Sequence, residues 1–294
     1  MISKKYKVRA PGSCGELMQG MICEKNFHVT CPINLFSEIT VSIFKNSDIV
    51  CINNDRKDSW KATVAMRKTL DYFGNNNLGG IIKIKSKIPS GKGMASSTAD
   101  ISGVILATAL NLKEFISEDE ISKIALSIEP TDGIMFKDIC LFDHKQGLLF
   151  ERLGNISENK IIVIDARGIV DTIEFNKKDN YKLLSENEEQ INKTLAKLRG
   201  GFTCNNINII GECSTESAIL NQKILYKDYL DKSIELAFKY GASGINIAHS
   251  GTVTGIILPP DITLKKDFYL DIFKIFKYYP KIYECKIING GLIA

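Results

Sequence analysis

No two cysteines in this chain have the spacing C-x-x-C, although the chain contains 8 cysteines. A structural zinc site of the cysteine type is therefore not expected. No apolar run approaches the roughly 18 residues of a membrane span, and the first residues lack the apolar core of a signal peptide. We therefore expect a cytoplasmic protein with reduced thiols and no membrane partner.

The sequence also lacks a strong excess of one charge. Its 38 basic and 34 acidic residues leave a formal net charge of +4. Nucleic-acid binding, which needs a basic stripe, is not expected from this balance. The chain has 294 residues, of which 44% are hydrophobic, so it can bury a sizeable core in one large domain or two ordinary ones.

Apolar periodicity predicts helices and strands in both halves of the chain. We expect an α+β fold with two domains, residues 1–155 and 156–294, because a polar segment near residue 155 separates two apolar ones. Residues 6–10 are predicted to form a strand that ends at Pro11-Gly12, and residues 46–59 a loop. The sequence Ser117-Glu-Asp-Glu120 is a capping box that should open a helix.

The most informative segment is PSGKGMASSTA, which starts at Pro89, follows a predicted strand and opens a predicted helix. Glycines let a backbone approach phosphate oxygens, and helix N-terminal N–H groups attract anions. Three consecutive hydroxyls add donors, and a serine hydroxyl can ligate Mg²⁺. The order of residues matches neither the usual P-loop nor the dinucleotide fingerprint. A flexible, capped helix entry is the competing interpretation, but a cap explains only one of the hydroxyls.

Two further segments sharpen this interpretation: the first motif, APGSCGELMQG at residues 10–20, and the third motif, GASGINIAHSGTVTGIIL at residues 241–258. With the phosphate loop, residues 89–98, they resemble the three signature motifs of the GHMP kinase superfamily, in the same order. The resemblance implies a two-domain GHMP kinase fold with the ATP site between the halves. The positions that match the middle motif and are expected to bind ATP are Pro89, Gly93, Met94, Ala95, Ser96, Ser97 and Thr98. Gly91 and Lys92, in the same loop, are expected to bind ATP with them.

The resemblance also implies roles for individual residues. ATP and Mg²⁺ are the expected cofactors, with Ser97 and Glu129 as metal ligands. Asp132 is expected to take the acceptor proton, and Lys92 to add positive charge beside the phosphates. Phosphoryl transfer requires mainly positioning and charge stabilisation from a protein. The residues expected to hold the acceptor are Ser13, Glu16, Asn34 and Asp132.

Within the superfamily, the amino-acid sequences of several segments are similar to those of the L-threonine kinase branch, which belongs to cobalamin biosynthesis. That resemblance implies an amino-acid alcohol as substrate. Another acceptor, such as L-serine or homoserine, and a non-catalytic nucleotide-binding protein remain open alternatives, as does a homodimer. Trp60 is a candidate neighbour of the adenine, and Asp165 and Arg167 are further candidates for the acceptor site. Cys14 is interpreted as a small packed residue and His249 as a hydrogen-bonding residue rather than a base.

Overall fold

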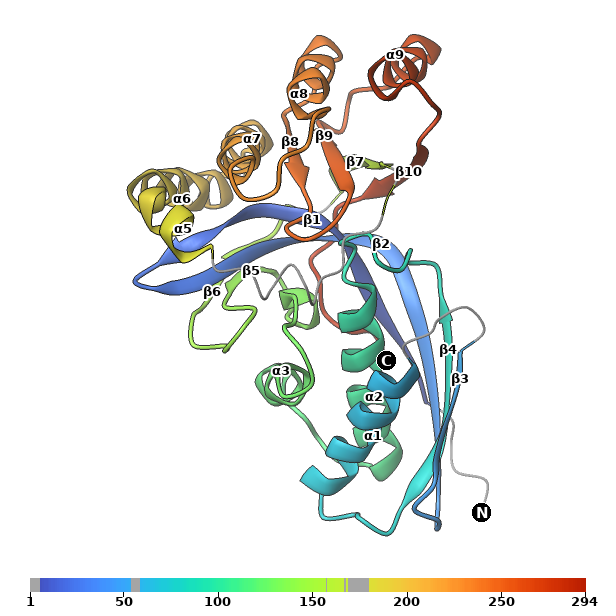
Figure 1. Cartoon of the computed structure of the whole chain (residues 1–294). Helices are drawn as coiled ribbons and strands as arrows, with labels where there is room; N and C mark the ends of the chain where they lie inside the picture. Colours follow the sequence, from blue (N-terminus) through green and yellow to red (C-terminus); the bar gives the residue numbers. More distant parts are fainter. Residues whose placement is uncertain (1–5, 54–58, 157, 167, 169–179) are drawn as a thin grey trace.

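Two long antiparallel strands, β1 (Tyr6–Ile22) and β2 (Lys25–Phe44), run through the centre of the molecule (Figure 1). The computed structural model describes residues 6–53, 59–156, 158–166, 168 and 180–294. In this part of the chain, a sheet of ten strands contains both β1 and β2. Strands from before and after residue 155 belong to this sheet, so both predicted halves contribute to it.

The remaining elements follow in chain order. The other strands are β3 (Ile49–Asn53), β4 (Gly79–Ser86), β5 (Ile139–Phe142), β6 (Phe150–Gly154), β7 (Lys160–Asp165), β8 (Gly244–Ile247), β9 (Val253–Leu258) and β10 (Lys281–Lys286). The helices are α1 (Ser59–Tyr72), α2 (Ser96–Leu112), α3 (Glu118–Leu126), η1 (Gly133–Met135), α5 (Tyr181–Glu186), α6 (Glu188–Thr203), α7 (Ile207–Asn221), α8 (Leu230–Lys239) and α9 (Lys266–Phe276). This mixture of elements confirms the α+β class.

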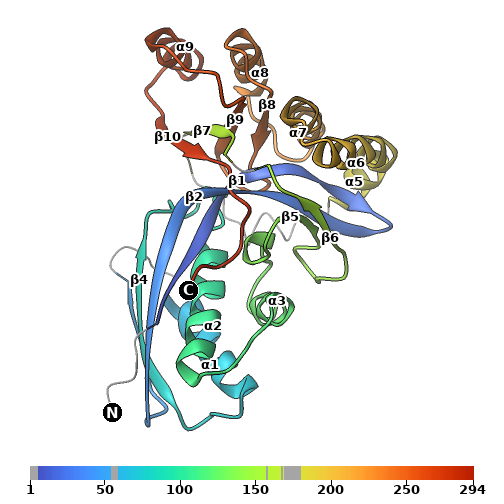
Figure 2. The same ribbon diagram turned by 180° about the vertical axis from the view of Figure 1, so that it is seen from behind.

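The sheet has the strand order β10-β7-β9-β8-β1-β2-β4-β3, with β5 and β6 attached beside β2. Helices α1 and α2 lie along the part formed by β1 to β4 (Figures 1 and 2). Helix α6 packs against β1, β6 and α7, helix α7 against β1 and β8, and helix α8 against β8 and α9. The strands β1 and β8 meet at one residue pair, Glu16 and Ile247. The junction between the two parts of the sheet is therefore built on the first motif.

Helix α2 is apolar on nearly every side because it packs against β1, β2, α1 and α3. It lies close to the sheet at Gly103, where a Cβ atom would come within 2.4 Å of the Ile39 side chain. This packing fixes the N-terminus of α2 at the junction between the two parts of the sheet. The predicted capping box of α3 is confirmed, since Glu120 N donates to Ser117 Oγ at 3.2 Å and Ser117 N to Glu120 Oε2 at 2.7 Å.

Two local predictions were wrong. The first strand does not end at Pro11-Gly12 but continues to Ile22, with register shifts at Pro11/Gly12 and further along. Bulges accommodate a proline that cannot donate to the ladder, so the turn signal marked an irregularity inside a strand. The predicted loop at 46–59 contains β3, which pairs in parallel with β4.

The end of the chain returns to the first part of the sheet. Arg9 N donates to Ile293 O at 2.7 Å, and Ile293 N donates back to Arg9 O at 2.9 Å. The division of the chain into two domains near residue 155 stays a prediction. Segments that follow this residue pair with segments that precede it. Of the helices in the described ranges, none combines the length and the apolar character that crossing a membrane requires.

Candidate active site

The phosphate loop joins β4 to α2 and has an unusual backbone. Gly91, Gly93 and Ala95 alternate along it with φ values of 70°, 77° and 55°. Ala95 is the N-cap of α2 and its side chain makes no capping hydrogen bond. Successive N–H groups in such a conformation form a concave site for anions, to which the helix dipole adds positive charge. The left-handed conformation costs an alanine about 1–2 kcal/mol, which other contacts must offset.

The three motifs meet at this loop. From the first motif, Ser13 N donates to Met94 O at 3.0 Å. From the third motif, Thr252 N donates to Lys92 O at 3.1 Å. Segments from both ends of the chain therefore hold the loop in its shape, and a single motif alone does not make the site.

Gly93 is the point of closest approach between the phosphate loop and the third motif. A Cβ atom at this position would lie 2.5 Å from Ala248 Cβ and 2.9 Å from Gly251 Cα. Gly93→Ala should therefore lower the free energy of unfolding by about 2–5 kcal/mol, the sum of backbone strain and overpacking. Gly200→Ala is the matched control, because nothing lies within 4 Å of its added Cβ in α6.

Urea denaturation of both variants tests this prediction. Gly200→Ala should be neutral or stabilising by up to about 1 kcal/mol, since alanine loses less conformational entropy in a helix. An unchanged unfolding midpoint for Gly93→Ala would show that the loop does not have this close contact.

Ser97 and Glu129, the two predicted metal ligands, lie side by side. Ser97 Oγ donates to Glu129 Oε1, and Lys61 Nζ lies 2.8 Å from Glu129 Oε2 and 3.4 Å from Ser97 Oγ. A cationic group is therefore already in contact with both. A serine hydroxyl and a carboxylate are oxygen ligands of the kind that Mg²⁺ takes, so these residues fit the ion. Lys61 was not predicted, because no motif marks this position of α1.

Asp132 lies next to this group. Its N–H donates to Thr98 Oγ1 at 3.3 Å, so the phosphate loop holds the residue from one side. From the other side, Thr131 N donates to the backbone oxygen of His144 at 2.9 Å. The segment from Glu129 to Asp132 is thus fixed between the start of α2 and the turn after β5.

Two carboxyl groups and one histidine face one another here. His28 Nδ1 is 3.6 Å from Asp132 Oδ1 and 3.8 Å from Glu16 Oε1. Burial raises the pKa of Asp132 to about 6. Burial, and then the charge of Asp132, raise the pKa of Glu16 well above its usual range. A carboxyl group with a pKa near neutrality is suited to exchange protons with a substrate.

The other predicted site residues divide into two sets. Ser13 is buried close to the loop, whereas Asn34 is exposed and its Oδ1 accepts from Lys286 N at 2.9 Å. Asn34 lines a pocket with Arg9 and Phe36 that contains no other residue predicted to hold the acceptor. The structure therefore brings Ser13, but not Asn34, to the phosphate loop.

The remaining candidates lie at the edge of the site or away from it. Lys92 Nζ is 2.8 Å from Asp165 Oδ1, so this side chain bridges to the end of β7 instead of folding over its own loop. Arg167 lies outside the described residues. Cys14 is fully buried, and burial raises the pKa of its thiol well above the usual range. Its surroundings are those of a packed residue and not of a nucleophile.

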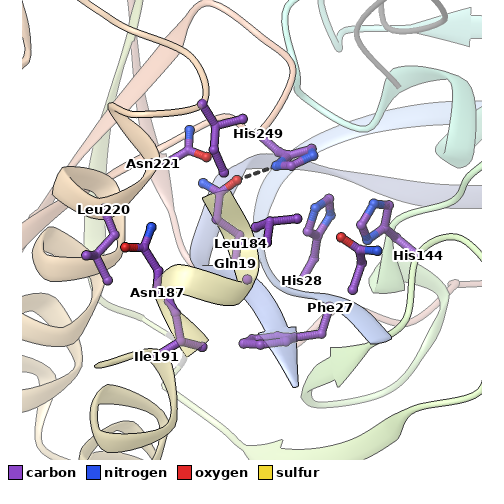
Figure 3. Close-up of a pocket in the computed structure, with 13 residues that line it drawn as sticks. Gln19, Phe27, His28, His144, Leu184, Asn187, Ile191, Leu220, Asn221 and His249 are labelled. Carbon is purple, nitrogen blue, oxygen red and sulfur yellow. Dashed lines mark hydrogen bonds between the residues drawn. The ribbon is translucent and has the colours of Figure 1, made fainter. Parts of the chain in front are cut away.

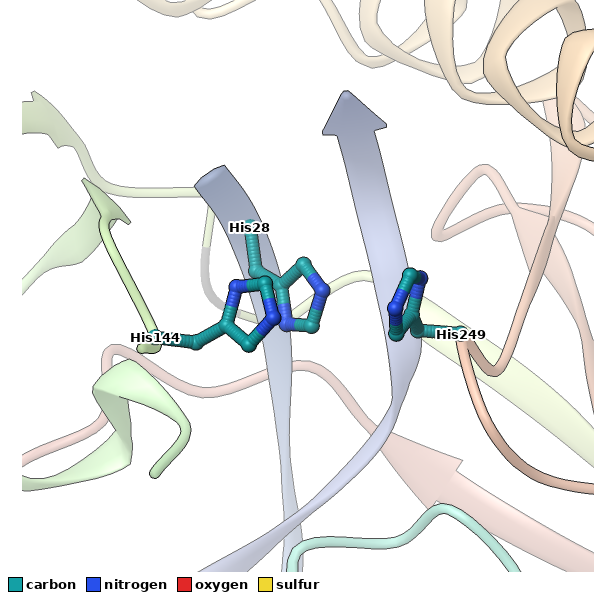
Figure 4. A group of neighbouring side chains, drawn as sticks. All are labelled: His28, His144 and His249. Atoms are coloured by element: carbon teal, nitrogen blue, oxygen red, sulfur yellow. The ribbon is translucent and has the colours of Figure 1, made fainter. Parts of the chain in front are cut away.

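All 3 histidines of the sequence gather at one place (Figure 4), and His28 lies beside Glu16 and Asp132. The rings of His28 and His144 are stacked, with centroids 3.6 Å apart and planes at 9°. His249, which was expected to form a hydrogen bond, has its Nδ1 against Gln19 Oε1 (Figure 3). No local motif joins these three positions, and for that reason the sequence did not predict the cluster.

The histidine cluster predicts a loss of stability on mild acidification. Burial lowers the pKa of His28 from 6.5 to about 3 and also lowers those of His144 and His249. The folded rings stay neutral while the unfolded chain takes up protons below about pH 6.5, so stability present above that pH is lost as the pH falls. At pH 6 the cost is about 1 kcal/mol per histidine.

Urea denaturation at about pH 7.5 and pH 6, in buffer with a chelator, measures this loss. His144→Gln should remove about a third of it, since one of three similar groups no longer titrates. Asp132 and Glu16 act in the opposite direction, because their raised pKa values favour the folded state on acidification, and Asp132→Asn controls for the first of them. Equal stability of the Glu16→Gln/Asp132→Asn variant at the two pH values would contradict neutral histidines in the folded state.

Comparisons with known proteins identify relatives of this chain. Residues 60–141 match the family model of the GHMP kinases N-terminal domain. Over 287 residues the chain is 28% identical to the L-threonine kinase of Citrobacter freundii. The alignment covers 97% of this chain and 98% of that protein. The L-threonine kinase of Salmonella typhimurium is likewise 28% identical over 97% of this chain and 94% of its own length. The chain belongs to the GHMP kinase superfamily.

Solved structures of the superfamily have the same fold as this GHMP kinase. A mevalonate kinase covers 97% of the chain and 100% of its own with a TM-score of 0.73 and 19% identity. The homoserine kinase of Cytophaga hutchinsonii covers 98% of the chain and 96% of its own with a TM-score of 0.71 and 15% identity. At these identities the likeness shows the fold alone, and it confirms the predicted two-domain GHMP kinase fold.

Proposed function

We propose that this GHMP kinase transfers the γ-phosphoryl group of ATP to the side-chain hydroxyl of L-threonine, giving L-threonine O-3-phosphate. The observation that carries the proposal is the convergence of the phosphate loop, the Ser97–Glu129 pair and Asp132 at one place. The acceptor is inferred from the relatives that align over 97% of the chain, both of which are L-threonine kinases.

The nucleotide is proposed to bind at the start of α2. The phosphate loop would receive the phosphates on its N–H groups, and Ser97 with Glu129 would hold Mg²⁺. The ion neutralises phosphate charge as it develops during transfer. Lys61, which contacts both residues, is suited to pair with a phosphate oxygen once Glu129 has another cation to balance it.

The acceptor is proposed to bind between the first motif and Asp132. Ser13 Oγ, Glu16 Oε2 and Thr131 Oγ1 are buried atoms for which the described part of the chain provides no hydrogen-bond partner. Such atoms cost about 1–3 kcal/mol each unless a ligand satisfies them. An amino acid offers matching groups, since its ammonium donates to a carboxylate and its carboxylate accepts from a hydroxyl.

Asp132 is proposed to take the hydroxyl proton of the acceptor as the oxygen attacks phosphorus. Its raised pKa makes it a better proton acceptor than an exposed carboxylate, while it stays ionised at neutral pH. Transfer of the proton to Asp132 leaves the oxygen free to bond to phosphorus as the bond to ADP breaks. The proposed product would supply cobalamin biosynthesis, and we place the reaction in the cytoplasm.

A panel of acceptors tests the proposal. ADP formation is measured with L-threonine, L-serine, L-homoserine and pantoate at equal concentrations, and nucleotide binding is followed by the fluorescence of Trp60, the single tryptophan of the chain. L-threonine should exceed L-serine by roughly 10–200-fold in kcat/KM, the value of one methyl group in a fitted pocket. A stronger response to another member of the panel would replace L-threonine as acceptor. Nucleotide binding with no response to any member would contradict the kinase.

A further inference from the structure

The histidine cluster, His28, His144 and His249, is assembled from three distant parts of the chain. They come from β2, from the turn after β5 and from the loop between β8 and β9. One nitrogen from each ring can be chosen so that all three lie within 4.8 Å of one another. Figure 4 shows His249 facing the stacked pair from the opposite side.

Two rings of the cluster, those of His28 and His144, are almost completely buried. His28 and His144 are each 4% exposed, and both nitrogens of each ring are buried without a hydrogen-bond partner among the described residues. A cavity of 20 Å³ opens beside the three rings (Figure 3). That volume holds about one water molecule or one ion, and it is too small for an amino acid. The nitrogens of His28 and His144, together with this cavity, therefore suit a ligand that is small and accepts lone pairs.

We propose that the histidine cluster binds one divalent transition-metal ion, with Zn²⁺ as the first candidate. Imidazole nitrogen is a preferred ligand of Zn²⁺, which binds it at about 2.0–2.1 Å in a tetrahedral arrangement. Three nitrogens that already lie within 4.8 Å of one another reach that distance after an inward movement and the rotation of one ring. The ring of His28 or His144 must rotate, because stacked parallel rings cannot both point at one ion.

The contacts around the cluster orient two of the three ligands. His249 Nδ1 donates to Gln19 Oε1, which places the lone pair of that ring on Nε2. His28 Nδ1 is next to the carboxylates of Glu16 and Asp132, at 3.8 Å and 3.6 Å. Histidines that ligate metals usually direct their second nitrogen to a carbonyl or a carboxylate, so this arrangement is the one that such a site requires.

The histidine cluster is distinct from the site proposed for Mg²⁺. Ser97 and Glu129 offer oxygen ligands, which Mg²⁺ prefers, whereas the histidine cluster offers nitrogen ligands, which favour Zn²⁺. A bound ion would touch His28, whose other nitrogen faces Glu16 and Asp132. The inference does not depend on the identity of the acceptor, and its test measures metal binding without any turnover.

Cobalt provides the direct probe. The full chain is treated with a chelator, freed of it, and titrated with Co²⁺ while visible absorption is followed, and Zn²⁺ is then added as competitor. We expect one Co²⁺ per chain, the d–d bands of a tetrahedral ion, and displacement by Zn²⁺. His144→Gln and His249→Gln should abolish the bands, and Gln19→Leu should weaken binding by roughly 10–100-fold.

Exposed thiols are the main competing ligands, so Cys23→Ser/Cys204→Ser is the matched control. It should bind Co²⁺ as the wild-type chain does. Circular dichroism checks that each histidine variant folds, and X-ray absorption of the Zn²⁺-loaded wild-type chain gives an answer even if a variant does not. A first shell of imidazole nitrogens supports the proposal. Absence of binding, a first shell containing sulfur, or binding that survives both histidine substitutions would overturn it.

Discussion

Asp132→Asn is expected to lower kcat for L-threonine by roughly 10²–10⁴-fold, the contribution of a positioned general base. The substitution keeps the shape of the side chain and the N–H contact to Thr98, so the phosphate loop should keep its structure. The KM for ATP should change little, because nucleotide binding does not require removal of the acceptor proton. Steady-state kinetics with each substrate varied in turn separate the two effects.

The pH dependence gives a second measure of the same role. A base whose pKa is raised to about 6 must lose its proton to act, so kcat/KM should fall as the pH drops below about 6. Asp71→Asn is a suitable control, since that carboxylate is exposed at the end of α1. A kcat for Asp132→Asn within about twofold of wild type would remove this residue from the mechanism, and positioning with Mg²⁺ would then carry the reaction.

Ser97→Ala and Glu129→Gln should each lower the Mg²⁺-dependent rate by roughly 10²–10³-fold, similar to the loss of one preorganised electrostatic contact in other active sites. Each substitution removes one oxygen ligand or one negative charge from a hard cation. Glu129→Gln also removes the ion-pair partner of Lys61, so this variant should show the larger effect. Both should need more Mg²⁺ for half-maximal rate.

Titrating the initial rate with Mg²⁺ at saturating ATP measures these effects. Glu114→Gln, in the exposed turn after α2, is the control for loss of a carboxylate. Wild-type Mg²⁺ dependence in both variants would mean that the ion binds elsewhere. Fluorescence of Trp60 with ATP distinguishes loss of the metal from loss of the nucleotide.

The parts of the site that are continuous in sequence were predictable. The phosphate loop follows from local rules, since glycines permit left-handed backbone and a helix start attracts anions. Ser97 and Glu129 are 32 positions apart, and only the resemblance to the GHMP kinases suggested that they meet. The structure has them in direct contact, and Asp132 lies next to the same helix start.

The parts that depend on tertiary packing were not predictable. Lys61 reaches the site because α1 packs beside α2, which no periodicity of α1 reveals. The cluster of His28, His144 and His249 results from the order of strands in the sheet, and Lys92 pairs with Asp165 for the same reason. A single sequence encodes such contacts only through the complete fold.

Direct detection of the product tests the central claim. The chain is incubated with ATP, Mg²⁺ and L-threonine, and ³¹P NMR with mass spectrometry identifies every phosphorylated species, with Asp132→Asn analysed in parallel. We predict L-threonine O-3-phosphate and ADP in equal amounts, formed by wild type and strongly reduced in the variant. ADP without L-threonine O-3-phosphate, or no consumption of ATP, would contradict the proposal that this GHMP kinase phosphorylates L-threonine.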